Sequence, residues 1–349
     1  MQRLVRNPLY LDTARIGLMR CGARQACEDM AAIASIDPHT VYHEFVCPSG
    51  PSLIRHWHGM DALKKKVLDR VQFSAHTELE AASNSATLLK LAGRCLFSKA
   101  NNPLTTDLIW PNHLNRLQTE AKLANKKLQV VPLREQIVNG AAVGEILAQI
   151  VEAYSRNHCD ALFLTAISSD GIRLPIEDIV NKLRGIHLPK LTIVDGAQEF
   201  THLNQKSDKP VCDMYLFGSH KWLGAYYPVS LMSFGLARSK EYILRTRDRM
   251  IANCDLSDPL LANVFCSNGS DRYETVDLKP FFAVSGAIHS LLDADLDDDV
   301  LQSNARLFLT VAQKNRWRIA SVAPEFRTGI CLIQQDSKNC LAPRKMEYE

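Results

Sequence analysis

The middle of the chain alternates short apolar runs with longer amphipathic segments. The apolar runs are nearly continuous, as expected of strands that are buried on both faces of a sheet. They cover residues 107–110, 128–132, 161–165, 191–194, 214–217 and 229–233. Between them, apolar positions recur with the period of a helix over residues 87–97, 114–125, 142–154 and 175–183. This alternation predicts an α/β fold with a mostly parallel sheet that helices cover on both faces.

The pattern changes beyond residue 285. One helix is predicted over residues 298–314 and one strand over 329–333, before a polar tail over 334–349. We therefore expect a large domain over 21–285 and a small, truncated α+β unit over 286–349. Because parallel sheets bind ligands at the carboxyl ends of their strands, functional residues should directly follow the predicted strands.

Composition and charge argue against several kinds of function. Apolar residues make up 46% of the chain, charged residues 23%, and the net charge is only +3. The densest basic run, residues 64–66, lies in a helical pattern and is interpreted as a solvated helix face, so no nucleic-acid role is predicted. No apolar stretch approaches the roughly 20 residues that a membrane helix needs. No signal peptide is recognisable, and we expect a cytoplasmic protein.

The ten cysteines do not suggest a metal site. None forms a CxxC pair, and no group of His and Cys has the spacing of zinc ligands. Several of the cysteines lie inside apolar runs, as small buried side chains do.

The strongest candidate chemistry lies between residues 191 and 224. Asp195 ends an apolar strand, and Lys221 follows the next one, beside Trp222 and Leu223. Burial of an amine among apolar side chains lowers its pKa and makes it a nucleophile that can form a Schiff base. A carboxylate at the neighbouring strand end can hold the proton of a pyridine ring. Taken singly, the lysine fits a surface turn and the aspartate a helix cap; the pair at this spacing favours the chemical interpretation.

This segment resembles the cofactor region of class V aminotransferases, pyridoxal-phosphate (PLP) enzymes of fold type I. The group includes cysteine desulfurases, kynureninases and isopenicillin-epimerase-like proteins. That family has a D-x-A-Q or D-x-A-H element followed by an S-x-H-K or x-H-K-W element around the cofactor lysine; residues 195–198 match the D-x-A-Q form and residues 219–222 the x-H-K-W form. The resemblance implies a seven-stranded-type sheet sandwiched by helices. It also implies that Asp195 binds the pyridine nitrogen, Ala197 packs on the ring and Gln198 bonds the phenolic oxygen. Ser219 is a further cofactor-binding residue, His220 touches the phosphate and Lys221 forms the Schiff base.

Two further segments are similar to cofactor-binding elements of that family. Ser85, Ala86 and Thr87 stand where the family has its phosphate loop, with Ser85 in place of the usual glycine; hydroxyls at a helix start bind anions, although a plain N-cap is the alternative. Trp110 precedes a proline, as does the aromatic residue that stacks on the PLP ring. A buried core tryptophan is the alternative, and His113 is a second stacking candidate.

The resemblance also suggests substrate and subunit contacts. Ser168 and Ser169 lie in the loop that faces the substrate in the family, although Asp170 and Gly171 also suit an ordinary turn. Residues 10–17 match the N-terminal strand of the family, so residues 1–20 should pack near the mouth of the site. Residues 272–280 resemble the segment that reaches the phosphate of the neighbouring subunit, with Thr275 as its hydroxyl. A two-fold homodimer with the site at the interface follows.

The resemblance covers residues 8–333 and ends where relatives continue for several dozen residues. The missing part carries the arginine that grips a substrate carboxylate, and Arg15, Arg327 or Arg344 are the candidate substitutes. A desulfurase needs a cysteine on a mobile loop, and Cys331 and Cys340 are the only late ones. Cys331 lies in a strand pattern, which favours the core.

The predicted function is that of a PLP-dependent enzyme acting on an amino acid or related amine. Lys221 would serve as general base, and Asp195 would keep the pyridine ring protonated. An aminotransferase is the nominal prediction. The alternatives are a lyase of the desulfurase or kynureninase kind, an epimerase, or a non-catalytic PLP-fold subunit.

Overall fold

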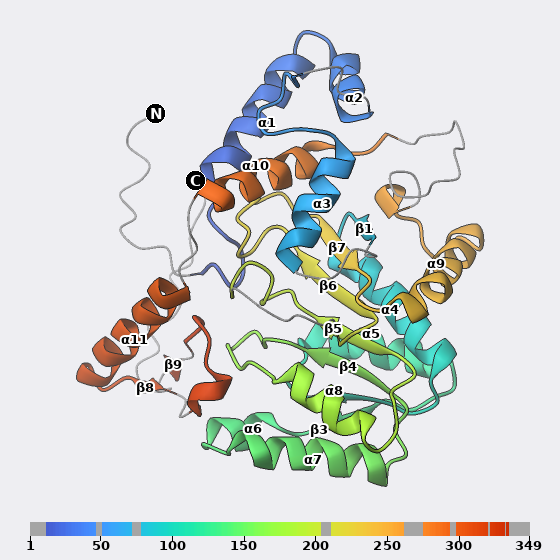
Figure 1. Ribbon diagram of the computed structural model, residues 1–349, viewed down its shortest axis with the longest axis vertical. Helices are drawn as coiled ribbons and strands as arrows, with labels where there is room; N and C mark the ends of the chain where they lie inside the picture. The colour runs from blue at the N-terminus through green and yellow to red at the C-terminus, as the bar shows by residue number, and fades with distance from the viewer. Residues whose placement is uncertain are drawn as a thin grey trace, which may run out of the picture.

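A computed structural model describes residues 12–46, 51–71, 78–203, 211–261, 275–293, 298–319, 322–331 and 333–334 (Figure 1). Its centre is a seven-stranded sheet in the order β1-β7-β6-β5-β4-β2-β3. Only β7 runs against its neighbours, since β1–β7 and β6–β7 are antiparallel and the other pairs are parallel. The strands are β1 (Leu79–Ala82), β2 (Pro103–Thr106), β3 (Gln129–Val131), β4 (Ala161–Thr165), β5 (Thr192–Asp195), β6 (Met214–Gly218) and β7 (Ser230–Ser233). The predicted fold, a mostly parallel sheet between helices, is confirmed.

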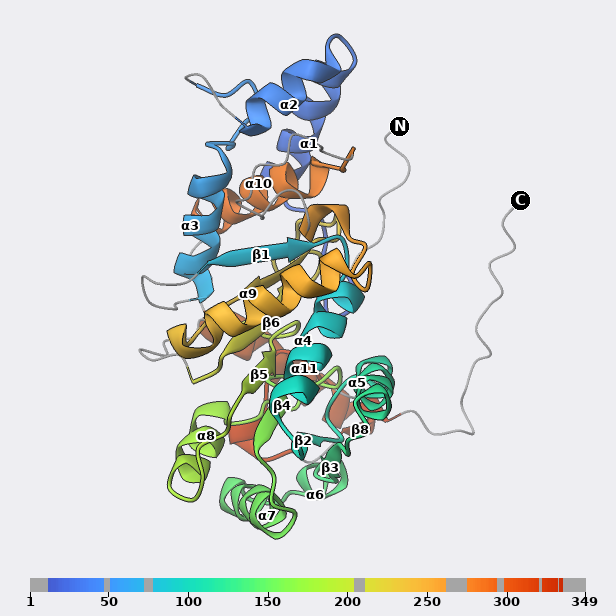
Figure 2. The same cartoon turned by 90° about the vertical axis from the view of Figure 1, so that its right-hand side faces the viewer.

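Successive residues of each strand point to opposite sides of the sheet. Both sides are apolar, and helices cover both of them. Phe163 and Ile193 pack toward α4 (Ser85–Lys99), α5 (Pro111–Leu123) and α9 (Ala237–Ala252). Figure 2 shows these three helices in front of the sheet. On the other face, Leu162 and Leu164 pack against α6 (Arg134–Val138), α7 (Val143–Arg156) and α8 (Ile176–Arg184).

The remaining helices extend the molecule beyond the sheet. Val194 and Phe217 belong to a core that includes residues of α1 (Cys21–Ala34), α2 (Pro38–Val46), α3 (Met60–Val71) and α10 (Lys279–Asp293). Near the C-terminus, α11 (Asp298–Lys314) lies beside a small antiparallel pair, β8 (Arg318–Ile319) and β9 (Ile333–Gln334).

The structure corrects three details of the sequence prediction. Residues 107–110 form a turn that leads into α5, and the strand lies just before them at 103–106. The first strand of the sheet, residues 79–82, was not anticipated. Residues 329–331 are not a strand, and β9 begins only at Ile333. Each of these strands is only two to four residues long, and β1 pairs with residues about 150 positions away, so the local sequence pattern is weak.

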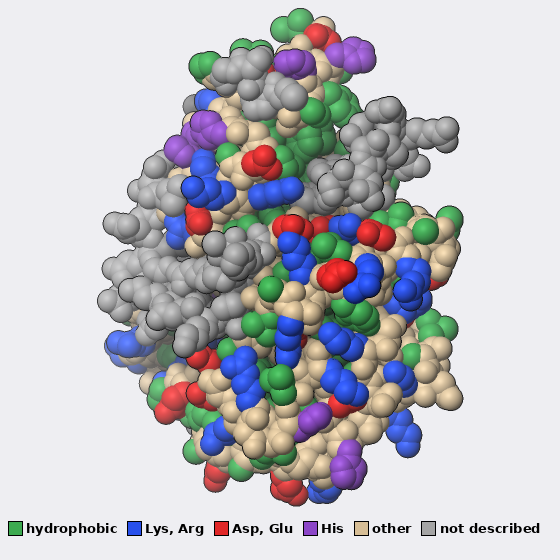
Figure 3. Space-filling view, turned by 45° about the vertical axis from the view of Figure 1, so that its right-hand side comes forward, with side chains coloured by type: hydrophobic (Ala, Val, Ile, Leu, Met, Phe, Trp, Pro, Cys, Tyr) green, Lys and Arg blue, Asp and Glu red, His purple; other side chains and the backbone are tan. Residues whose placement is uncertain are grey.

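Two surface properties follow from the described residues. No described helix combines the length and the apolar character that spanning a membrane requires. Figure 3 shows Lys and Arg side chains interspersed with Asp and Glu over one face of the molecule.

Candidate active site

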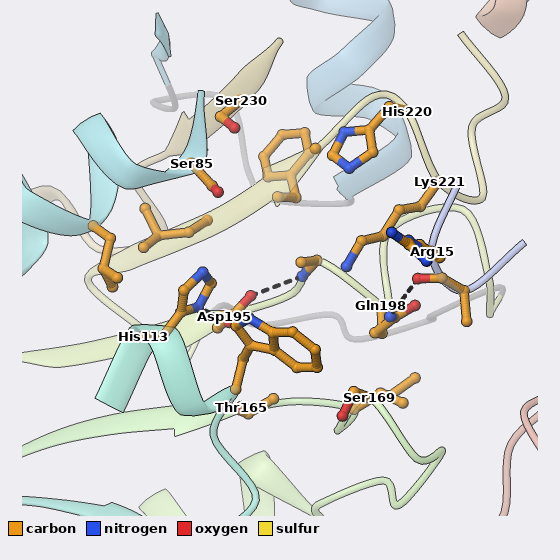
Figure 4. Close-up of a pocket in the computed structure, with 18 of the residues that line it drawn as sticks. Arg15, Ser85, His113, Thr165, Ser169, Asp195, Gln198, His220, Lys221 and Ser230 are labelled. Atoms are coloured by element: carbon orange, nitrogen blue, oxygen red, sulfur yellow. Dashed lines mark hydrogen bonds and ion pairs between the residues drawn. The ribbon is translucent and has the colours of Figure 1, made fainter. Parts of the chain in front are cut away.

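A cavity of about 540 Å³ lies where β4, β5 and β6 end and α4 begins. This is the edge of the sheet at which parallel strands place ligands. The predicted site residues that line the cavity are Arg15, Ser85, Trp110, Ser169, Asp195, Ala197, Gln198, His220 and Lys221 (Figure 4). Residues from six separate parts of the chain therefore meet at one position.

Asp195 is a buried carboxylate that is held ionised. Its Oδ1 accepts a hydrogen bond from the Ala197 N–H at 3.0 Å, and its Oδ2 lies 3.0 Å from Nδ1 of His113. Burial by itself raises the pKa of Asp195, but the hydrogen bond and charge of His113 outweigh it, and the pKa lies below its ordinary value. His113, in the first turn of α5, is thus a direct partner of the carboxylate, whereas the sequence offered it only as a second candidate for stacking.

Lys221 lies in the turn after β6, and its amine faces the same cavity as Asp195 (Figure 4). Burial lowers the pKa of Lys221, and attraction to Asp195 partly offsets this effect. The two side chains form no direct ion pair, and no other described residue pairs with the amine. The charges are close enough to interact yet leave space between them, as a ligand bound to both requires.

The N-terminal segment braces the backbone of Lys221. The Gly17 N–H donates to the carbonyl of His220 at 2.7 Å. A Cβ at Gly17 would lie 1.9 Å from the Lys221 carbonyl oxygen, so only glycine allows this close approach. Arg20 adds hydrogen bonds to the carbonyls of Leu223 and Gly224. Of this segment, Asp12, Ala14 and Arg15 line the cavity, while the packing of residues 1–20 as a unit stays a prediction.

Three residues at the start of α4 were predicted to bind the phosphate, and one of them reaches the cavity. Ser85 lines the cavity, whereas Ala86 and Thr87 do not. The Thr87 N–H donates to the N-cap side chain of Asn84 at 3.1 Å, and its hydroxyl donates to Asp258 at 3.2 Å. Asp258 also accepts hydrogen bonds from the N–H and hydroxyl of Ser83. Thr87 thus bonds the helix cap and Asp258, while the N-terminus of α4, with its positive dipole, lies at the cavity.

Ser219 and His220 differ although they are adjacent. The Ser219 hydroxyl bonds the backbone of Tyr227 and Val229 and holds the loop between β6 and β7. His220 lines the cavity, and its buried Nδ1 has no hydrogen-bond partner among the described residues. Burial and the neighbouring Lys221 lower the pKa of His220 to about 4, so the ring is neutral. A buried nitrogen without a partner is a group that a bound ligand can satisfy.

Two hydroxyl residues that the sequence did not single out also reach the cavity. Ser230 begins β7 and lies near Ser85 and His220 in Figure 4. Thr165 ends β4 beside Asp195, and its buried hydroxyl has no partner among the described residues. Neither belongs to a recognisable local motif. The only available signal was their position at a predicted strand end.

Gln198 lines the cavity but uses its amide to connect neighbouring segments. Its Nε2 donates to the carbonyl of Ala14 at 2.7 Å, and its Oε1 accepts from Nε1 of Trp222 at 2.9 Å. The ring of Trp222 stacks on His202 with centroids 3.7 Å apart. His202 in turn accepts the N–H of Gly329 at its Nε2. One amide hydrogen of Gln198 remains available for a ligand.

The predicted substrate residues separate into two groups. Ser169 and Arg15 line the cavity. Ser168 is fully buried, and its hydroxyl bonds Asp170 and the N–H of Ile172, which is the turn that the sequence offered as the alternative. Arg327 lines a second cavity of about 330 Å³, together with Cys331.

The remaining candidates lie elsewhere. Thr275 is exposed and does not line the main cavity of this chain. Arg272, Cys340 and Arg344 lie outside the described residues. Burial raises the pKa of Cys331, which does not favour a thiolate. The described residues contain no group of three or more His, Cys, Asp or Glu that could hold a metal ion.

Comparison with known proteins agrees with this geometry. Residues 111–226 match the family described as Aminotransferase class-V. This segment includes His113, Asp195 and Lys221. The resemblance expected from the sequence is thus confirmed over this segment, and the family that the segment matches is PLP-dependent. No curated protein sequence matches the chain.

Solved structures with the same fold are very different in sequence. The apo cysteine desulfurase of Thermococcus onnurineus NA1 has a TM-score of 0.65 at 13% identity, over 94% of this chain and 79% of that one. An alanine–glyoxylate aminotransferase from a Nostoc species has a TM-score of 0.65 at 16% identity, over 96% and 83%. The ureidoglycine–glyoxylate aminotransferase of Bacillus subtilis has 0.61 at 11%, over 86% and 76%. The fold is therefore shared by enzymes with different reactions.

Proposed function

We propose that this protein is a PLP-dependent enzyme in which Lys221 forms a Schiff base with the cofactor, and that it transfers the amino group of an amino acid or related amine. The observation that carries the proposal is the pair formed by Asp195 and Lys221. An ionised carboxylate and an amine of lowered pKa face one cavity from different strand ends without pairing directly. When bound there, PLP would draw electrons from the α-carbon of the substrate.

The residues at the buried end of the cavity would keep the pyridine nitrogen of a bound ring protonated. Asp195 stays ionised because His113 and the Ala197 N–H bond its two oxygens. It can therefore hold a proton on the pyridine nitrogen of a bound ring. Ala197 and Trp110 line the same cavity and supply apolar surface for the ring.

The other end of the cavity suits a phosphate. Ser85, Ser230 and the neutral His220 line it, and the N-terminus of α4 adds its positive dipole. The partnerless Nδ1 of His220 supports the fit, because a phosphate oxygen would satisfy that nitrogen. These residues fit PLP although Thr87 and Ser219 are engaged elsewhere.

Lys221 would have two tasks in catalysis. Its lowered pKa leaves a larger neutral fraction of the amine at neutral pH, and the neutral amine is the nucleophile. The same amine, when it is not bonded to the cofactor, would be placed to accept a proton from the α-carbon of a substrate. The close packing of Gly17 on its backbone keeps the amine directed toward that position.

Other outcomes use the same two residues. A lyase of the desulfurase or kynureninase kind, or an epimerase, also begins by removing the α-proton, and a non-catalytic PLP-fold subunit would bind the cofactor alone. We also propose a cytoplasmic homodimer with the site at its interface, where Thr275 would face the phosphate of the partner. The divisions at residues 20 and 285 stay predictions.

The central experiment is reduction of the PLP-loaded protein with borohydride, followed by peptide mapping. Hydride adds to the C=N bond and leaves a stable secondary amine, so the modified lysine can be identified by mass. The expected result is modification of Lys221. Modification of another lysine, or of none, would contradict the proposal.

A second measurement separates the reactions. Incubation with a panel of amino acids should release a 2-oxo acid if the amino group is transferred. Release of ammonia would indicate β-elimination, release of alanine from cysteine or kynurenine would indicate a desulfurase- or kynureninase-like lyase, and a change of chirality without net loss would indicate an epimerase. Cofactor binding without any of these products would identify the non-catalytic alternative.

A further inference from the structure

Arg15 is a cation at the mouth of the main cavity. It lines the cavity with Lys221 and Gln198 and is exposed to solvent (Figure 4). Within the part of the chain that the structure describes, no carboxylate or carbonyl bonds its guanidinium group. The donors of this side chain are therefore available to a ligand.

The backbone on both sides of Arg15 is held in place. The N–H groups of Arg15 and Ile16 both donate to the carbonyl of Asp12, which forms a tight turn. The Ala14 carbonyl accepts from Gln198, and the Gly17 N–H donates to His220. The backbone around Arg15 is thus tied to His220 and Gln198, which line the same cavity as Lys221.

The other cationic side chains of the cavity have different properties. Lys221 is the reactive amine, and His220 is neutral because burial and Lys221 lower its pKa to about 4. Asp12, in the same turn as Arg15, also lines the cavity and disfavours a second negative charge on the ligand. At the mouth of the cavity, the guanidinium group of Arg15 can therefore bind one negative group of a ligand.

Arg327, the other described candidate, lies apart from the reactive amine. It lines the second cavity, and its Nε donates to the carbonyl of Val322. None of the residues around this second cavity is Asp195, Lys221 or His220.

We infer that Arg15 binds the carboxylate of the substrate, and that the substrate is therefore an amino acid rather than a simple amine or an amino sugar. A guanidinium can donate two parallel hydrogen bonds to a carboxylate. The α-amino group would then lie toward Lys221 and the side chain toward solvent and Ser169. This inference rests on the proposed function, because it places a substrate relative to the lysine.

Equilibrium binding to the PLP-loaded protein tests the inference without measuring turnover. L-alanine, L-serine and L-phenylalanine are each titrated beside the corresponding amide, and the change in cofactor absorbance gives the dissociation constant. The wild-type protein should bind at least one acid more tightly than its amide. In Arg15→Gln the affinity for that acid should fall about 10- to 100-fold, while the affinity for the amide stays the same.

Two variants provide matched controls. Arg15→Lys keeps the charge but loses the paired geometry, and it should recover part of the affinity for the acid. Arg327→Gln removes an arginine from the second cavity and should bind the acid as the wild type does. Unchanged cofactor affinity and circular dichroism would show that each variant is folded.

Several results would overturn the inference. Equal binding of acids and amides by the wild type, or binding of neither, would remove the need for a carboxylate partner. Loss of acid binding in Arg327→Gln, but not in Arg15→Gln, would assign the role to the second cavity. Failure of the proposed function is seen separately, since a wild-type protein that forms no lysine-bound PLP after borohydride reduction fails before any substrate is added.

Discussion

The two ends of the main cavity differ in how their polar side chains are used. At the ends of β5 and β6, Asp195 and Lys221 face the cavity and do not pair with each other. At the start of α4, Thr87 bonds Asn84 and Asp258, and only Ser85 reaches the cavity. A strand end directs side chains by its own geometry, whereas hydroxyls at a helix start have many nearby backbone and side-chain partners. Motif spacing was accordingly a better guide at the first end than at the second.

The largest effect is expected at Lys221. Lys221→Ala removes the nucleophile and general base, so activity should fall by about 10²–10⁴-fold or more. Borohydride should then attach no PLP at this position. Lys182→Ala, on the exposed side of α8, should behave as the wild type in both measurements. Retained turnover in Lys221→Ala would remove the chemical distinction between the two ends.

A similar loss, with cofactor binding retained, is expected at Asp195. The neutral amide of Asp195→Asn cannot keep the pyridine nitrogen protonated, and we expect activity to fall by about 10²–10³-fold. His113→Gln should have a smaller effect of the same kind, because it removes one partner of the carboxylate without removing its charge. Turnover and borohydride labelling measured in parallel distinguish the two roles. If labelling of Lys221 is lost in Asp195→Asn, the aspartate positions the lysine instead.

The stability of the fold near β5 should also depend on pH, because His202 is buried there. Burial lowers the pKa of His202 from 6.5 to about 4 in the fold. The neutral ring is thus favoured by folding, and the associated stability is complete above pH 6.5 and is lost as the pH falls from 6.5 toward 4. The loss is on the order of 2–3 kcal/mol for one such group. Urea unfolding at a series of pH values measures it.

A variant isolates the contribution of His202. His202→Gln loses the stacking on Trp222 and should be less stable at pH 7, but its stability should depend less on pH. His220, whose pKa is also about 4, keeps the remaining dependence. An unaltered pH profile in His202→Gln would show that the ring is not protected from protons.

The smallest effects compare two neighbouring hydroxyls of α4. Ser85→Ala should weaken PLP binding by about 3- to 10-fold with little change in stability, as the loss of one hydrogen bond to the ligand predicts. Thr87→Val should lower stability by about 1 kcal/mol and leave the dissociation constant of PLP nearly unchanged. Cofactor titration and urea unfolding of both variants measure these effects. The opposite pattern would show that Thr87 turns toward the phosphate when the cofactor binds.

The sequence predicted the sheet well but not its edges. Buried parallel strands such as 161–165 are short apolar runs, and these are visible without knowing their partners. The strand at 79–82 pairs with residues about 150 positions away, and no local sequence pattern predicted it. Residues 107–110 are as apolar as a strand but turn into α5, because the ladder ends at Thr106 and a proline begins the helix.

For this protein, the sequence alone determined the class of fold and the pair formed by Asp195 and Lys221, because both follow from local patterns at strand ends. Only the tertiary structure decided which polar groups are left unpaired. It committed Thr87, Ser168 and Ser219 to internal hydrogen bonds, gave Asp195 the partner His113, and separated Arg15 from Arg327 into two cavities. The physical reason is that availability to a ligand depends on every neighbour that competes for the same donor or acceptor, and those neighbours come from distant parts of the chain.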